Sequence, residues 1–299
     1  MDLDVIIPVK DRPTVEQCVA TLLKESDRTP NFKLRQILLC DGGSTNADCC
    51  AQLTKVSQQS QVNILQCPHK GFNKGWLLNQ GLLAATELLI LISDVDIVWT
   101  TKTLIELSQA AAQNPYTFYH IQSVQESQFQ NIAVQRSRYA YCITQSLTEK
   151  RVEIYADMTQ AQVRPGYGLL CAHRELLEQV GGYRHDFAGW GWEDQDLLMR
   201  SQLLGYAIRA LGTVTHLSHP DTHRNQFSQQ CPQQSRDRNI RRCLDGLAQG
   251  KLWGDLRATS TAERTYAGKI SIHYPPQLHH AAYPDHPLPR SSCSSNESA

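Results

Sequence analysis

The sequence lacks two features on which several functional classes depend. It has no excess charge, since 29 lysines and arginines balance 29 aspartates and glutamates among its 299 residues. A balanced chain is not drawn to nucleic acid or to an anionic membrane by bulk electrostatic attraction, so we expect no nucleic-acid partner. No apolar run approaches the ~20 residues that span a bilayer, and we therefore expect no transmembrane segment.

Signals for export and for disulfide bonding are also missing. The N-terminal sequence MDLDVIIPVKDRP has no basic stretch ahead of its short apolar run, as a signal peptide would have. The ten cysteines include no C-x-x-C pair, and several lie inside apolar runs, where a free thiol packs as a small hydrophobic group. We therefore expect a cytoplasmic protein with reduced cysteines and no structural zinc.

What the sequence does contain is an alternation of strand-like and helix-like segments over its first hundred residues. Short apolar runs predict four buried strands, at residues 3–9, 34–40, 62–66 and 88–92. Helical spacing predicts helices at residues 15–24 and 73–86. This order predicts an α/β fold with a mostly parallel central sheet and helices on both faces.

The pattern is weaker in the middle of the chain and at its end. Residues 116–163 are rich in glutamine and serine, which predicts one strand followed by irregular structure. Regular patterns return as an apolar segment at 166–171, helices at 174–180 and 193–204, and a strand at 207–215. We expect one domain over residues 1–225, a helical extension over 226–255 and, because serine, proline and histidine dominate it, a disordered tail over 256–299.

Polar, turn-rich sequences follow three of the predicted strands. They are Lys10-Asp11-Arg12, Asp41-Gly42-Gly43-Ser44 and Asp94-Val95-Asp96. Ligands of parallel sheets bind beyond the carboxyl ends of the strands. The sequence therefore predicts a binding site where these three turns meet.

Asp94 and Asp96 form the first motif that can carry chemistry. Residues two apart on an extended backbone point the same way, so both carboxylates can face one ligand. Paired hard oxygen ligands suit Mg²⁺ or Mn²⁺, and such an ion can bridge a diphosphate. The alternative is a loop with two solvated aspartates, one of which caps a helix that begins near Thr101.

The second motif is the run Gly-Trp-Gly-Trp-Glu-Asp-Gln-Asp at residues 189–196. The indole rings of Trp190 and Trp192 can pack against sugar rings. Glu193 and Asp194 would open the next helix, where the helix dipole favours their ionised form, and an ionised carboxylate can act as general base. The alternative is an acidic helix start beside two core tryptophans.

The remaining candidates are histidines and isolated charges. His216 and His219 follow the last predicted strand, and imidazole binds Mn²⁺, although most of the 11 histidines of such a chain are expected to be solvated. Arg12 and Lys74 can bind phosphates, and Asp41 can accept a hydrogen bond from a base such as uracil. Each of these three can equally be a surface charge.

Taken together, these motifs resemble those of the GT-A glycosyltransferases. IIPVKDR, the DGGS turn and the D-x-D are similar to the family 2 pattern. The later motifs are similar to the β-1,4-galactosyltransferases and the polypeptide N-acetylgalactosaminyltransferases. Four galactosyltransferase motifs have counterparts here in the same order, at residues 72–81, 93–96, 190–196 and 216–219. In that family they read Phe-Asn-Arg-Ala-Lys-Leu-Leu-Asn-x-Gly, Ser-Asp-Val-Asp, Trp-Gly-Gly-Glu-Asp-Asp-Asp and Met-x-x-His. The resemblance extends over roughly residues 3 to 225.

The resemblance implies a nucleotide-binding half over residues 1–100 and an acceptor and catalytic half over residues 101–225. The nucleotide and donor sugar would contact Pro8, Val9, Arg12, Asp41, Phe72, Asn73, Lys74, Asp94 and Trp190. A Mn²⁺ or Mg²⁺ ion would bind Asp96, His219 and His216. An acceptor and sugar pocket would contain Tyr167, Gly168, Trp192 and Asp196. The catalytic pair would be Glu193, which holds hydroxyl groups, and Asp194, the general base.

The activity implied is transfer of a hexose or N-acetylhexosamine from a UDP-sugar to a hydroxyl of a carbohydrate or glycoconjugate acceptor, with inversion. A retaining transferase and a non-catalytic nucleotide-sugar-binding module are the alternatives. A sugar nucleotidyltransferase would carry a glycine-rich loop after its first strand, where this chain has PVKDRP. Trp192 replaces a family glycine, as in Trp-Glu-Asp variants similar to bacterial chondroitin polymerases. We expect no Golgi anchor ahead of the domain. The donor sugar and the acceptor are therefore left open.

Overall fold

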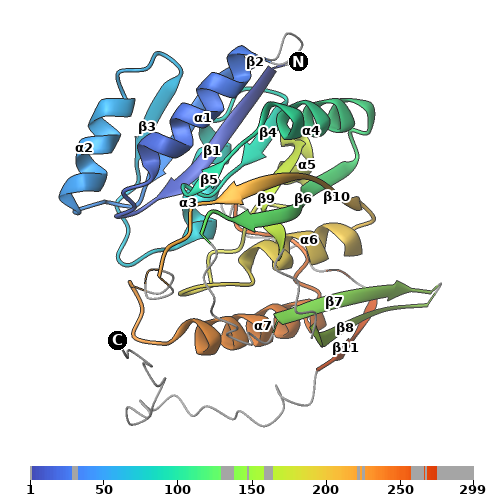
Figure 1. Ribbon diagram of the computed structural model, residues 1–299. Coiled ribbons are helices and arrows are strands. Elements are labelled where there is room, and N and C mark those ends of the chain that lie inside the picture. The colour runs from blue at the N-terminus through green and yellow to red at the C-terminus, as the bar shows by residue number, and fades with distance from the viewer. Residues whose placement is uncertain are drawn as a thin grey trace.

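The structure is a computed structural model in which a large central sheet carries helices on both faces (Figure 1). It describes residues 2–28, 33–128, 138–146, 148–157, 164–220, 223, 226–256, 266 and 268–274. Helix α7 and a small second sheet lie beyond one face of the central sheet (Figure 1). No helix in these ranges has the length and apolar character needed to cross a membrane.

Strands and helices alternate along the chain, as the sequence predicts for its first part. The elements up to residue 113 are β1 (Asp2–Val9), α1 (Val15–Asp27), β2 (Lys33–Asp41), α2 (Ala47–Val56), β3 (Val62–Gln66), α3 (Lys74–Ala84), β4 (Leu89–Ile92), β5 (Ile97–Val98) and α4 (Thr101–Gln113). Those that follow are β6 (Thr117–Glu126), β7 (Arg138–Gln145), β8 (Glu149–Asp157), β9 (Arg164–His173), α5 (Arg174–Gln179), α6 (Glu193–Leu203), β10 (Ala207–His216), α7 (Pro232–Ala248) and β11 (Lys269–His273).

The central sheet has the strand order β3-β2-β1-β4-β9-β6-β10-β5. Strands β3, β2, β1 and β4 are parallel to their neighbours in this run, and β6 is parallel to β10. The antiparallel pairs are β4 with β9, β9 with β6, and β10 with β5. The predicted mostly parallel α/β sheet is therefore confirmed.

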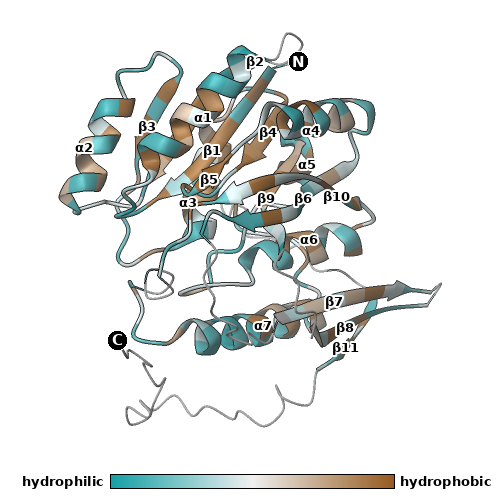
Figure 2. Ribbon diagram, viewed as in Figure 1, coloured by the Kyte–Doolittle hydropathy of each residue, from teal (hydrophilic) through white to brown (hydrophobic). Residues whose placement is uncertain are grey.

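Alternate side chains of the central strands build two separate cores, one on each face. In β1, Val5 and Ile7 belong to the core shared with α1, α2 and α4. Ile6, between them, belongs to the core shared with α3, α5 and α6. Burial on both faces explains why these strands are continuous apolar runs rather than alternating ones (Figure 2).

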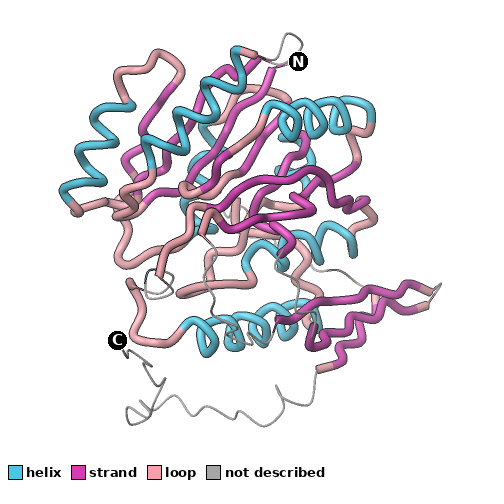
Figure 3. Tube along the Cα trace, viewed as in Figure 1, coloured by secondary structure: helices cyan, strands magenta, loops and turns pink. Residues whose placement is uncertain are grey.

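A third layer corrects two predictions about the second half of the chain. Strands β7 and β8 pair within residues 116–163, where irregular structure was predicted after one strand, and β11 pairs with β8 inside the predicted disordered tail, 256–299. This sheet, of order β11-β8-β7, lies beside α7 and apart from the central sheet (Figure 3). Val152 and Ile154 of β8 belong to the core that contains α6 and α7. The apolar side chains of this sheet lie on the face that those helices cover.

Helix α7 lies within residues 226–255, the segment predicted as a helical extension. Its buried residues join those of α6 in the third core, so the extension covers the outer side of α6. The nine cysteines in the described ranges are free thiols in the structure, and Cys293 lies outside those ranges. Most of the predicted tail, residues 257–265 and 275–299, also lies outside them.

Candidate active site

A cavity of about 420 Å³ opens beyond the carboxyl ends of β1 and β4 and extends to α6, β7 and the start of α7. It lies at the edge of the sheet that the three polar turns predicted. Most of the sequence-predicted site residues line it: Pro8, Arg12, Phe72, Lys74, Asp94, Asp96, Tyr167, Gly168, Trp190, Trp192, Glu193, Asp194, His216 and His219.

The pairing of β5 with β10 brings the aspartate turn to the histidine turn. β5 begins directly after Asp96, and its first residue, Ile97, is paired with His216 at the end of β10. The backbone N–H of Leu217 donates a hydrogen bond of 2.8 Å to the carbonyl of Asp96. Asp96 and His216 are 120 positions apart in the sequence, and the pairing of these strands makes them neighbours.

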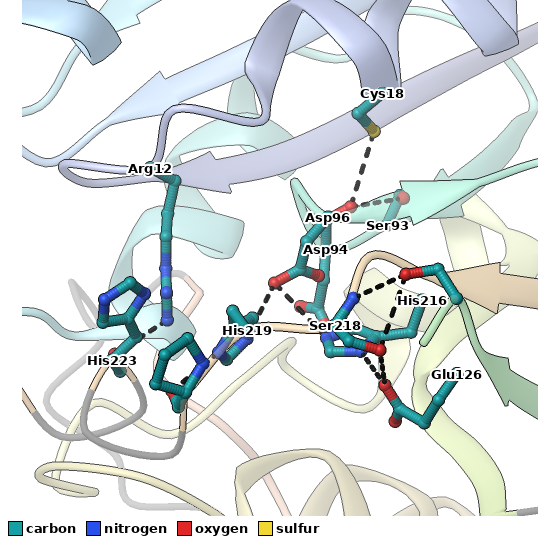
Figure 4. A network of polar contacts seen from close by, with 12 residues as sticks. Arg12, Cys18, Ser93, Asp94, Asp96, Glu126, His216, Ser218, His219 and His223 are labelled. Atoms are coloured by element: carbon teal, nitrogen blue, oxygen red, sulfur yellow. Dashed lines mark hydrogen bonds and ion pairs between the residues drawn. The ribbon is translucent and has the colours of Figure 1, made fainter. Parts of the chain in front are cut away.

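Asp96, His216 and His219 form a compact group that can hold a metal ion. The Oδ2 atom of Asp96 lies 3.5 Å from Nε2 of His216 and 3.3 Å from Nε2 of His219, and the three ligand atoms lie within 4.8 Å of one another. One carboxylate oxygen and two imidazole nitrogens are ligands that divalent metal ions accept, and the carboxylate suits Mn²⁺. We call these three residues the Asp96 group (Figure 4).

Electrostatics within the Asp96 group favour an ionised carboxylate. Burial alone would raise the pKa of Asp96, but hydrogen bonds and charge interactions with His216 and His219 hold that pKa well below its usual range. Burial would also lower the pKa of His216, and its contacts with Asp96 and Glu126 raise it instead. The carboxylate is thus ready to act as a ligand at neutral pH.

Glu126 is a member of this network that the sequence analysis did not single out. Its Oε2 atom accepts hydrogen bonds from Nδ1 of His216 at 2.7 Å and from the hydroxyl of Ser218 at 3.0 Å (Figure 4). Glu126 is the last residue of β6. The sequence feature that could have pointed to Glu126 was its position at the end of a predicted strand. The residues that follow it show no clear pattern.

A second charged cluster surrounds Lys74, the first residue of α3. Its Nζ atom lies 2.9 Å from Oδ1 of Asp94, 2.9 Å from Oδ2 of Asp194 and 3.9 Å from Oε1 of Glu193. We call these four residues the Lys74 cluster. Gly168 makes room for it, since a Cβ atom there would lie 2.4 Å from Oδ2 of Asp194 and 2.8 Å from Nζ of Lys74.

The Lys74 cluster shifts the protonation of its own members. Burial would lower the pKa of Lys74, but Asp194, Asp94 and Glu193 together raise it well above its usual value. Burial and the charge of Asp194 raise the pKa of Glu193 to about 7, against a smaller opposing effect of Lys74. Burial also raises the pKa of Asp194, and Lys74 opposes that shift.

The turn before α6 takes backbone conformations that favour glycine. Gly189, Gly191 and Trp192 have φ values of 74°, 97° and 81°. Trp192 stands where the resembling family has glycine, and its side chain is 2% exposed within the core formed with α7. Trp192 is therefore mainly a core residue at the cavity wall. The backbone N–H of Trp190 donates a hydrogen bond of 2.8 Å to the hydroxyl oxygen of Ser235.

Asp196 is a correction, because it lies in the core and not in the acceptor and sugar pocket. Its side chain is fully buried, with Oδ2 2.7 Å from Nε of Arg200 and Oδ1 3.6 Å from Nη1 of Arg184. Two residues on from Asp194, a helix has turned by about 200°, so Asp196 faces away from the cavity. It neutralises buried arginines instead.

Three predicted nucleotide contacts, Val9, Asp41 and Asn73, also lie outside the described lining of the cavity. Val9 is buried, and its carbonyl accepts a hydrogen bond of 2.8 Å from the N–H of Gly42. Asp41 accepts hydrogen bonds from the N–H and hydroxyl of Ser44 at 2.9 and 2.7 Å. Asn73 caps α3. The Val9 carbonyl and the side chains of Asp41 and Asn73 thus shape the turns that carry the site.

The sequence analysis named Lys10 only as part of a turn and did not name Phe227, and both residues line the cavity, as Arg12 does. Lys10 donates hydrogen bonds to the carbonyls of Gly42 and His69 at 2.8 and 3.0 Å, and its ammonium lies 5.3 Å from the centre of the Phe227 ring. Arg12 donates a hydrogen bond of 2.8 Å to the carbonyl of His223. Cationic groups therefore border the cavity at the end of β1.

Several solved structures resemble the chain. The structure of GalNAc-T7 with UDP, GalNAc and Mn²⁺ has a TM-score of 0.59 at 14% identity, over 82% of this chain and 48% of that one. Mannosyltransferase PcManGT from Pyrobaculum calidifontis, with GDP-Man and Mn²⁺, has a TM-score of 0.48 at 20% identity, over 72% and 56%. The catalytic domain of Drosophila β1,4-galactosyltransferase 7 with xylobiose has a TM-score of 0.47 at 16% identity, over 77% and 75%.

This chain thus spans about half the length of the first two of these structures. The likeness to GalNAc-T7 confirms the predicted GT-A type of fold. No curated protein sequence matches the chain.

Two family models match. The model of the N-terminal domain of galactosyltransferase matches residues 161–223, which include the turn before α6 and the histidine turn. The model of glycosyl transferase family 2 matches residues 4–177, more than half of the 299 residues. The chain therefore belongs to glycosyl transferase family 2.

Proposed function

We propose that this chain is a glycosyltransferase that depends on a divalent cation and moves a sugar from a UDP-sugar to an acceptor hydroxyl with inversion. The observation that carries the proposal is the meeting of two clusters in one cavity. The Asp96 group can hold a cation, and the Lys74 cluster presents Asp194, a half-buried carboxylate at the cavity wall. A cation site and a base facing the same space are what such a transfer requires.

The Asp96 group would take the donor side of the reaction. Asp96, His216 and His219 would hold Mn²⁺ or Mg²⁺, which offsets the negative charge of a departing diphosphate. Arg12 and Phe72 line the neighbouring wall and would contact the nucleotide. The presence of UDP and Mn²⁺ in the GalNAc-T7 structure, whose fold this chain shares, supports this choice of donor.

The Lys74 cluster would take the acceptor side. Oδ2 of Asp194 is held by Lys74 at 2.9 Å, whereas its buried Oδ1 has no hydrogen-bond partner among the described residues. The contact with Lys74 fixes the direction of the carboxylate, and Asp194 lines the cavity, where it would accept the proton of an acceptor hydroxyl. Glu193, with a pKa of about 7, can both donate to and accept from a neighbouring hydroxyl.

A screen of UDP-sugars tests this proposal without knowledge of the acceptor. Slow release of UDP should be seen with at least one donor in the presence of Mn²⁺ and should stop when EDTA is added. Affinity for a donor without any UDP release, with or without a panel of carbohydrate acceptors, would instead indicate a non-catalytic binding module.

The stereochemistry of the released sugar separates inversion from retention. Proton NMR of the early product should show the β-anomer when the donor is an α-linked UDP-sugar. An α-anomer at the same time point would assign the chain to the retaining transferases and remove the need for Asp194 as base.

A further inference from the structure

We propose that Glu126 is a positioning residue of the cation site, which holds His216 in the tautomer and ring orientation that present Nε2 to the cation. This inference rests on the proposed function, because it takes the Asp96 group as the cation site. Glu126 acts through His216 and is not itself a ligand. Among the described residues, the group of candidate ligand atoms that all lie within 4.8 Å of one another consists of Asp96, His216 and His219 and does not include Glu126.

Sheet register, rather than a loop, places Glu126 beside His216. Strand β10 lies between β6 and β5 in the central sheet. His216, its last residue, is paired with Glu126 of β6 on one side and with Ile97 of β5 on the other. The histidine therefore lies between a carboxylate at the end of β6 and the turn that carries Asp96.

The two ring nitrogens of His216 face two different carboxylates. Nδ1 lies 2.7 Å from Oε2 of Glu126, and Nε2 lies 3.5 Å from Oδ2 of Asp96. A neutral imidazole has one N–H, and the shorter contact needs it, since a lone pair on Nδ1 would face the oxygen of Glu126 without a proton between them. Nε2 then keeps its lone pair for a cation, the arrangement found when a carboxylate orients a ligating histidine.

The turn from His216 to His219 is fastened to the end of β6 by further hydrogen bonds. The hydroxyl of Ser218 donates to Oε2 of Glu126 at 3.0 Å, and the N–H of Ser218 donates to the hydroxyl of Ser127 at 3.0 Å. The N–H of Ser127 donates to the carbonyl of His216 at 2.9 Å. Oε1 of Glu126 lies 3.4 Å from Nε of Arg164, so both carboxylate oxygens have partners.

Titration of Mn²⁺ in the absence of nucleotide, followed by electron paramagnetic resonance, tests this role. Glu126→Ala should raise the Kd for Mn²⁺ by about 10- to 100-fold, the usual effect of removing such a partner. Glu106→Ala is the matched control, because Glu106 is similarly exposed, at 34% against 37%, and pairs with Lys102 on α4 away from the cavity. Its Kd should equal that of the wild type.

Glu126→Gln sharpens the test, since it keeps an oxygen that can accept the hydrogen bond from Nδ1. Its Kd should lie closer to that of the wild type than the Kd of Glu126→Ala. Saturating Mn²⁺ should also restore most of the kcat of Glu126→Ala, because no group that touches substrate is lost. Thermal unfolding of each variant checks that it is folded. If Glu126→Ala does not fold, the Kd of Glu126→Gln is compared with that of Glu106→Ala instead.

Nitrogen-15 NMR of His216, recorded without cation in alkaline buffer, provides a readout that does not depend on metal. The wild type should show the proton on Nδ1, and Glu126→Ala should lose that preference. A proton on Nε2 in the wild type would overturn the inference. Equal Mn²⁺ affinity of Glu126→Ala and Glu106→Ala would also overturn the inference. If the wild type binds Mn²⁺ and Asp96→Ala does not, that result leaves the proposed function standing. A wild type without Mn²⁺ affinity would overturn both.

Discussion

The Lys74 cluster and the Asp96 group both contain carboxylates, but their charge is compensated in different ways. In the Lys74 cluster an ammonium lies 2.9 Å from both Asp94 and Asp194, so the cation is part of the protein. In the Asp96 group the carboxylate faces two imidazole nitrogens at 3.5 and 3.3 Å, and a neutral imidazole is itself a metal ligand.

This difference suggests a division of labour within the cavity. A cluster that holds its own cation fixes the direction of its carboxylates, which suits a base that must meet an acceptor hydroxyl. A cluster of carboxylate and imidazole can take up an external cation, which suits binding of a diphosphate. Three carboxylates around one lysine also leave an excess of negative charge, and the raised pKa of Glu193 relieves part of it.

Asp194→Asn should produce the largest effect if the Lys74 cluster supplies the base. The asparagine keeps the size of the side chain but cannot accept a proton, so kcat for sugar transfer should fall by roughly 10²- to 10⁴-fold. Affinity for UDP in the presence of Mn²⁺ should change little, because the proposed cation site is the Asp96 group and not the Lys74 cluster. Steady-state kinetics together with calorimetry measure both quantities.

Glu193→Gln is the control for that variant, because it alters the neighbouring carboxylate of the same helix. It should raise the acceptor KM at least as much as it lowers kcat. Near-normal turnover by Asp194→Asn would contradict the assignment, because it would show that transfer needs no proton acceptor at this position.

His219→Ala should have a smaller effect, confined to the cation. Loss of one ligand should weaken Mn²⁺ binding by at least about tenfold, or about 1.4 kcal/mol. His223→Ala should weaken it less, because His223 stacks on His219 at 5.7 Å between ring centres but is not a member of the Asp96 group. Equal losses in the two variants would mean that His219 is not a ligand.

The expected effect that lies furthest from activity is a pH dependence of stability caused by Glu193. Its pKa is about 7 in the folded chain against an ordinary value of 4.5, so between these values the folded state binds more protons than the unfolded state. The free energy of unfolding should therefore fall as the pH rises through this window. Glu193→Gln should flatten that decline in urea denaturation curves, and parallel curves for wild type and variant would show that Glu193 is not the cause.

Much of the first half of the fold could be predicted from sequence because its strands are buried on both faces. Such strands are continuous apolar runs, as in β1 and β4, and the polar turns after them mark the site. The strands of the small sheet have only one apolar face, and they are stable because α6 and α7 cover it. Nothing within residues 138–157 alone indicates that cover.

The parts of the candidate site that rest on local sequence motifs could be predicted. The parts that depend on tertiary contacts could not. The Asp96 group joins two motifs that sheet pairing brings together, and it was predicted because both motifs resemble those of the galactosyltransferases. Asp196 sits in the same acidic run as Asp194, but the turn of the helix places it against Arg200 in the core. Glu126 carries no motif, since its role comes from pairing with His216. A cytoplasmic location stays a prediction.

Calorimetric titration of UDP into the wild-type chain and into Asp96→Ala, both with Mn²⁺, tests most directly whether the Asp96 group binds the donor through a cation. Removal of the carboxylate takes away a ligand and a negative charge that offsets the charge of the ion. The affinity for UDP should fall by at least about tenfold, or about 1.4 kcal/mol, and EDTA should weaken binding to the wild type by a similar factor. Equal affinity of the two proteins for UDP would contradict the cation site.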